Sequence, residues 1–170
     1  MKSKILAYAA VFFLLVLLFN QISQFFEKVE LKSLDYKKGE IDNFVLTGIN
    51  NDRYMLKGKK LIDTAGGYII QDFNLEYFKD GERLFIYSDK GVYRKDKDIL
   101  DLEQNVKIVT HDLTMETQFL RMLVKERRAF NSNPVILYTE YMKTEGDNIF
   151  IDLVRERLKL ENVTTIYRGK

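Results

Sequence analysis

The chain is 170 residues long, and its 46% hydrophobic and 31% charged residues are typical of a folded domain rather than a disordered chain. Its net charge of +2 arises within the first 29 residues, so the remainder is balanced and lacks the basic excess expected for nucleic-acid binding. Cysteine is absent, which excludes disulfides, thiolate nucleophiles and cysteine-ligated metals.

The first predicted element is a membrane-spanning helix over residues 5–26. This stretch carries no charge, and at 1.5 Å per residue it spans about 33 Å, enough for a hydrocarbon core of about 30 Å. Lys2 and Lys4 precede it, which keeps the N-terminus cytoplasmic by the positive-inside rule. A cleaved signal peptide starts in the same way, but it needs small residues after the apolar core, where residues 20–26 are mostly bulky. The pattern favours a retained anchor, and with either segment residues 30–170 lie outside the cytoplasm.

The remainder of the chain is predicted to be all-β. After the N-terminal residues 1–4 and the helix, we expect a linker over 27–40 and one domain over 41–170. Apolar and polar residues alternate in short runs, and the single proline and many aromatics favour long strands. The clearest runs are residues 73–78, 84–88, 99–103 and 106–109. Turn signals lie at residues 64–67, 79–82, 94–98 and 145–148.

Residues 115–128 are ambiguous, because the apolar residues Phe119, Leu120, Leu123 and Val124 also suit one face of a helix. We interpret the segment as a bulged strand, since its neighbours belong to a repeated unit.

The unit combines a strand, a charged turn, a strand, an asparagine–valine step and another strand. Its valines are Val106, Val135 and Val163, at spacings of 29 and 28 residues. Stacked hairpins of this kind bury their apolar faces only against neighbours, and the asparagines would mark kinks or bulges. The repeat predicts stacked, V-shaped strand pairs.

A basic start, one predicted membrane helix and this repeat resemble the LptC family, the single-span component of lipopolysaccharide export. The most similar stretch is residues 84–108, and the steps at Asn133-Pro134-Val135 and Asn162-Val163 extend the likeness over nearly the whole chain. Its motifs are Ile86, Ser88-Asp89-Lys90-Gly91-Val92-Tyr93, Leu100-Asp101-Leu102 and Asn105-Val106.

The resemblance implies a periplasmic β-jellyroll, an open and twisted roll of stacked antiparallel strand pairs behind one inner-membrane helix. It further implies that the apolar interior carries lipid A acyl chains. Lipopolysaccharide would arrive from an inner-membrane ABC transporter and pass to a soluble periplasmic bridge protein of the same fold, through edge-strand pairing.

Alternation selects the candidate residues for such a lipid-binding groove. The same residues could instead form an ordinary closed core, and a protein of that kind would be a membrane-anchored adaptor that only docks partner proteins. A third option is a soluble β protein released by signal cleavage. The candidates are Tyr54, Leu56, Phe73, Leu75, Tyr77, Leu84, Ile86, Leu100, Leu102, Val106, Ile108, Ile149, Ile151, Leu158 and Leu160, followed by Val163.

Catalysis, cofactors and metals are not expected. His111 is the only histidine and stands beside Asp112, which suits a turn, and Gly66-Gly67 lacks the lysine of a phosphate-binding loop. Basic clusters at 57–60, 94–95, 125–128 and 155–157 could attract lipid A phosphates, but solvated turns explain them as well.

Overall fold

The computed structural model describes residues 39–49, 53–79, 81–152, 154–155 and 157–167. The predicted membrane helix over 5–26 lies outside these ranges. Within them, no helix has both the length and the apolar character needed to cross a membrane.

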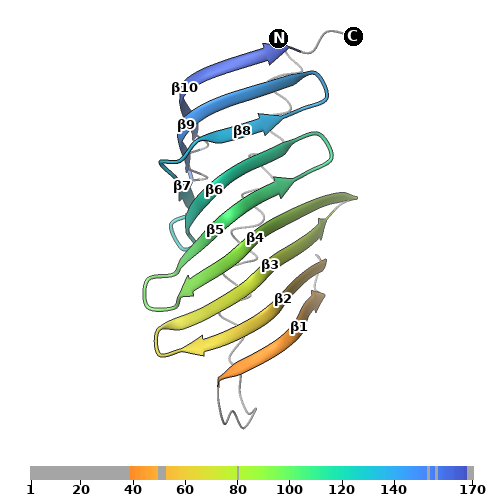
Figure 1. Cartoon of the computed structure of the whole chain (residues 1–170), viewed down its shortest axis with the longest axis vertical. Helices are drawn as coiled ribbons and strands as arrows, with labels where there is room; N and C mark the ends of the chain where they lie inside the picture. The colour runs from red at the N-terminus through yellow and green to blue at the C-terminus, as the bar shows by residue number, and fades with distance from the viewer. Residues whose placement is uncertain (1–38, 50–52, 80, 153, 156, 168–170) are drawn as a thin grey trace.

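The described residues form ten strands of one antiparallel sheet, which confirms the all-β prediction (Figure 1). Most strands are long, as the scarcity of proline favours. Their bounds are β1 Glu40–Ile49, β2 Arg53–Thr64, β3 Gly67–Lys79, β4 Glu82–Arg94, β5 Ile99–Val109, β6 Thr114–Leu123, β7 Arg128–Phe130, β8 Val135–Tyr138, β9 Met142–Asp152 and β10 Arg157–Tyr167.

Neighbours in the chain are neighbours in the sheet from β1 to β6, and β7 and β8 together fill the place between β6 and β9. The connections therefore alternate between two rims. The left rim in Figure 1 carries the turns β2–β3, β4–β5, β6–β7 and β9–β10. The right rim carries the connections β1–β2, β3–β4, β5–β6 and β8–β9.

A seam crosses the middle of the sheet, and there the alternation of buried and exposed residues slips by one position. β3 buries Ile70 and then Phe73, and β9 buries Gly146 and then Ile149. The slip keeps both arms of a bent strand pointing their apolar residues to one face. β2, β4 and β6 make the slip without a residue of positive φ, but in the other long strands it includes one, a conformation that Asn and Asp tolerate better than most residues. Such residues are Asn43, Asp72, Asn105, Asn148 and Asn162, with φ between 50° and 54°.

The predicted kinks at the asparagine–valine steps are confirmed. Asn105 and Asn162 have positive φ, and the third step falls in the break of residues 131–134 that separates β7 from β8. The ambiguous segment 115–128 is a strand up to Leu123, followed by a turn. The extra residue of the bulge lies on the partner strand β5, between Glu103 and Val106.

The turn predicted at residues 145–148 is wrong, because these residues lie inside β9. Glycine, aspartate and asparagine there serve the seam instead of a chain reversal. Asn148 supplies the positive φ. A Cβ on Gly146 would stand 2.6 Å from Cγ of Leu160, so the glycine lets β10 approach closely.

Alternate side chains of nearly every strand gather in one apolar cluster on the inner face. The described residues provide no second layer, so the sheet covers this face by curling across the seam. The fold is thus consistent with a β-jellyroll.

Candidate lipid-binding face

The inner face contains nearly all of the groove candidates. Tyr54 and Leu160 are partly buried against the central cluster, and Leu158 is exposed. The others are buried within the cluster: Leu56, Phe73, Leu75, Tyr77, Leu84, Ile86, Leu100, Leu102, Val106, Ile108, Ile149 and Ile151.

Sequence reasoning missed a second set of inner-face residues. Some follow the slip at the seam, which a simple alternation does not anticipate, and others lie in the segment that also suited a helix. They are Phe44, Leu61, Ile70, Tyr93, Met115, Leu120, Met122, Val124, Ala129, Val135 and Leu137.

The inner face is closed over the middle strands and uncovered at β10. Leu158 stands opposite Ile151 and so shares its face, yet Leu158 is 38% exposed and Ile151 only 1%. Thr165 places the second half of β10, because its Oγ1 lies 3.1 Å from that of the buried Thr144. Two residues to either side, Val163 and Tyr167 therefore face inward, and they are 53% and 61% exposed.

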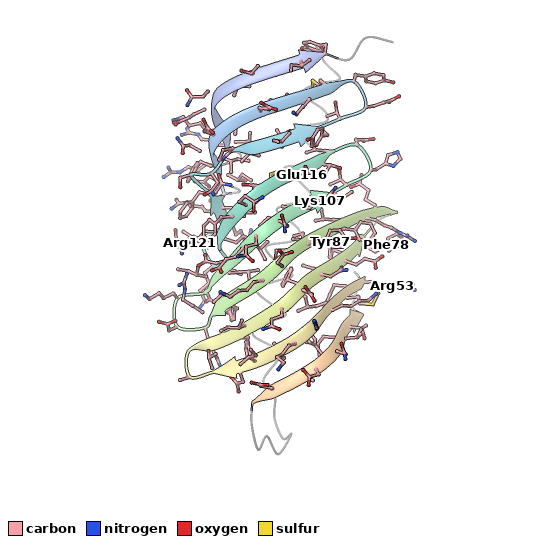
Figure 2. The ribbon with its side chains drawn as sticks, in the orientation of Figure 1. Arg53, Phe78, Tyr87, Lys107, Glu116 and Arg121 are labelled. Carbon is pink, nitrogen blue, oxygen red and sulfur yellow. The ribbon has the colours of Figure 1, made fainter. Side chains whose placement is uncertain are left out.

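At the opposite end of the sheet, a hollow of about 350 Å³ lies where β1 to β4 reach the right rim. Its walls include Tyr54, Phe78, Arg53 and Arg83. Figure 2 shows Arg53 and Phe78 at this rim. The ring of Tyr54 lies across Gly48, where a Cβ would come within 1.8 Å of it. The hollow is therefore an apolar recess with two arginines at its border.

Buried aspartates tie the left-rim turns together. The Tyr93 hydroxyl donates a hydrogen bond to Asp98 at 2.5 Å, and Lys125 of the next left-rim turn pairs with the same carboxylate. The backbone N–H of Val124 also donates to the Asp98 carbonyl at 2.9 Å. Burial alone would raise the pKa of Asp98, but the hydrogen bonds from Lys125 and Tyr93 hold it below its ordinary value of 3.8.

Asp152 links the β9–β10 turn to the β6–β7 turn in a similar way. Its carboxylate accepts hydrogen bonds from the backbone N–H groups of Val154 at 3.1 Å and Arg155 at 3.0 Å. Arg128 of the preceding left-rim turn pairs with it at 3.2 Å. Burial acts to raise the pKa of Asp152, and the Arg155 hydrogen bond and the Arg128 charge outweigh it, so the pKa is lowered.

On the outer face, Asp101 is nearly inaccessible because two arginines cover it. Arg121 donates two hydrogen bonds to it, at 2.7 and 2.8 Å, and Arg94 also pairs with it. Arg121 also lies over the ring of Phe119, 5.6 Å from its centroid, and Figure 2 shows it toward the left rim.

The basic clusters lie in different settings. Residues 57–60 lie within β2, between β1 and β3, so the turn predicted for them is wrong. The other three clusters do lie at left-rim turns. His111 lies in the β5–β6 connection, with a side chain that is 93% exposed. Among the described residues, no group of three or more histidines, aspartates and glutamates gathers to hold a metal.

One curled sheet with a continuous apolar inner face defines a β-jellyroll-like protein. The family model described as "Lipopolysaccharide-assembly, LptC-related" matches residues 6–168. The chain therefore belongs to the LptC family, whose members are membrane-associated lipopolysaccharide-transport components with a periplasmic domain and are not known as enzymes. No curated protein matches the sequence.

Proposed function

We propose that this chain is an inner-membrane protein that carries lipopolysaccharide along the inner face of its sheet. A helix over residues 5–26 would anchor it, and residues 41–170 would form an open periplasmic roll. It would receive the lipid from the inner-membrane ABC transporter. The acyl chains would then move along the inner face to a soluble periplasmic bridge protein of the same fold.

The observation that carries this proposal is the apolar inner face that runs across the whole sheet and stays uncovered at β10. An acyl chain out of water gains about 0.8 kcal/mol per buried CH₂, so such a face can hold a lipid without specific chemistry. Among the described residues β10 pairs only with β9, and its other edge would accept a strand of a partner.

A second candidate function is a membrane-anchored adaptor that only docks partner proteins. It is favoured by the middle of the inner face, where Leu102, Leu120 and Met122 are completely buried. In this case the apolar residues would be an ordinary core. Lipid transport then requires these side chains to part or the roll to open.

The two functions differ in whether lipid reaches the inner face. A photo-crosslinking amino acid at Ile86, introduced into the full chain with the exporter present, should capture lipopolysaccharide when ATP is hydrolysed. Tyr87 is the matched control, since it is the next residue of β4 and points to the outer face (Figure 2). Adducts at neither position, with an adduct on the transporter as the positive control, would favour the adaptor.

A further inference from the structure

The two rims of the sheet carry opposite charge. Each connection includes the last residue of one strand and the first residue of the next. The described residues of the left-rim connections include eight lysines and arginines and four acidic residues. The described residues of the right-rim connections include two basic and three acidic residues. The chain as a whole is nearly neutral, so the asymmetry belongs to the arrangement of the strands.

The positive charge is concentrated along one part of the left rim. The β2–β3 turn, residues 64–67, has no charged side chain, whereas each of the next three left-rim turns contains two or three basic residues. These three turns, at residues 94–98, 124–128 and 152–157, are called the basic ridge. Successive turns lie about two strand spacings, or roughly 10 Å, apart along the sheet. The ridge thus follows the sheet from β4 to its free end at β10.

Two acidic residues of the ridge, Asp98 and Asp152, are buried and pair with Lys125 and Arg128, as described above, so the outward positive charge comes from the other cations of the ridge. Through these pairs each turn of the ridge is fastened to the next. On the right rim, the β5–β6 connection is closed by Thr110 with Leu113 and the β8–β9 connection by Thr139 with Met142. The ridge turns are thus linked to one another, and their cations Lys95, Lys97, Arg155 and Arg157 are exposed.

The ridge borders the inner face directly. Leu100 lies two residues from the β4–β5 turn, and Ile151 is the neighbour of Asp152; both are buried in the apolar cluster. An amphiphile with its chains on this face would have its headgroup at one of the two rims. A headgroup bearing phosphates is attracted by lysine and arginine and repelled by the acidic right rim.

We propose that the basic ridge binds the phosphate groups of the lipid whose acyl chains occupy the inner face. This inference rests on the proposed function and adds an orientation to it. The lipid travels with its phosphates over the left rim, passing from one basic turn to the next toward β10.

The test compares two variants of the full chain with the same loss of charge. The ridge variant is K95Q/K97Q/R155Q/R157Q. The control is K57Q/K59Q/K90Q/K107Q, which removes four exposed or partly exposed cations from β2, β4 and β5 away from the ridge. Binding of bisphosphorylated lipid A and of its dephosphorylated form is measured for both, after thermal unfolding has shown that both are folded.

We expect the ridge variant to bind the bisphosphorylated lipid about tenfold more weakly and the dephosphorylated lipid unchanged, since each lost ionic contact is charge-assisted. The control should bind both lipids like the wild type. The proposal would be overturned if the ridge variant lost binding to both lipids equally or to neither, or if the control variant lost as much binding as the ridge variant. It would also be overturned by a ridge variant that loses only binding to anionic phospholipid vesicles. If the wild type binds neither form of lipid A, the proposed function itself fails.

Discussion

Individual side chains of the inner face contribute unequally to stability. Leu102 is completely buried between strands, whereas Leu158 has the same chemistry and the same face but lies on the edge strand β10. The pair separates what a leucine contributes to a packed core from what it contributes to an uncovered apolar edge.

We predict that Leu102→Ala lowers the free energy of unfolding by about 2–5 kcal/mol, because it removes buried surface and leaves a cavity. Leu158→Ala should cost about 1 kcal/mol or less, since much of that side chain stays in contact with water. Denaturant unfolding of the full chain measures both. Equal losses would mean that the inner face is not packed in the way described.

The buried aspartates make stability depend on pH. The pKa of Asp98 is lower in the folded chain than its ordinary value of 3.8. Its ionised form therefore contributes stability above the unfolded pKa, and that contribution is lost as the pH falls through 3.8 toward the folded pKa. The same holds for Asp152.

Asp98→Asn should therefore destabilise the domain at pH 7 by about 1–3 kcal/mol and flatten the loss of stability between pH 5 and about 3. Melting temperatures over this pH range test the prediction. Asp96→Asn, on the exposed part of the same turn, should keep the wild-type profile. The role of Asp98 is refuted if its variant loses stability with acid as steeply as the wild type.

At the scale of the strand, most of the fold could be predicted from alternation, and the seam could not. Residues 99–103 and 106–109 read as strands because apolar and polar residues alternate there, and both runs lie in β5. The slip by one residue between arms interrupts this period, so Asn148 with its neighbours reads as a turn. The correct signal is an asparagine or aspartate between two alternating runs of opposite phase, as at Asp72 and Asn162.

The seam predicts which substitutions a kink tolerates. Asn148→Gly should leave stability within about 0.5 kcal/mol of wild type, whereas Asn148→Val should cost about 2 kcal/mol, because a β-branched residue at positive φ is strained. Unfolding of both variants of the full chain measures this. A valine variant as stable as the glycine variant would show that β9 is not kinked at this position.

At the scale of the whole molecule, the candidate site is only partly readable from sequence. The pattern of apolar positions on β2 to β5 leads to the inner face, because each run keeps one phase within an arm. The opposite charge of the two rims is invisible in the chain, since basic and acidic turns alternate and nearly cancel in the total. Only the antiparallel stacking brings the basic turns to the same side.

The uncovered end of the sheet gives a prediction about transfer. Val163→Arg places a charge on the exposed inner face of β10 and should reduce passage of lipopolysaccharide to the bridge protein at least about fivefold, since a charge opposes apolar contact. Thr164→Arg, the next residue and on the outer face opposite Glu145, should have little effect. Lipid recovered on the bridge protein in a reconstituted system is the measurement. If both substitutions reduced transfer equally, transfer would not depend on the inner face of β10.

The central claim is that both arms of the curled sheet turn one continuous face toward lipid. Photo-crosslinking along β9 tests it most directly, because Thr144 and Ile151 have opposite phase in the sequence but the same inner face across the seam. With the exporter hydrolysing ATP, we predict lipopolysaccharide adducts at Thr144 and Ile151 and none at the outer residues Glu145 and Phe150. Adducts at Glu145 and Phe150 in place of the inner pair, or at none of the four positions, would contradict it.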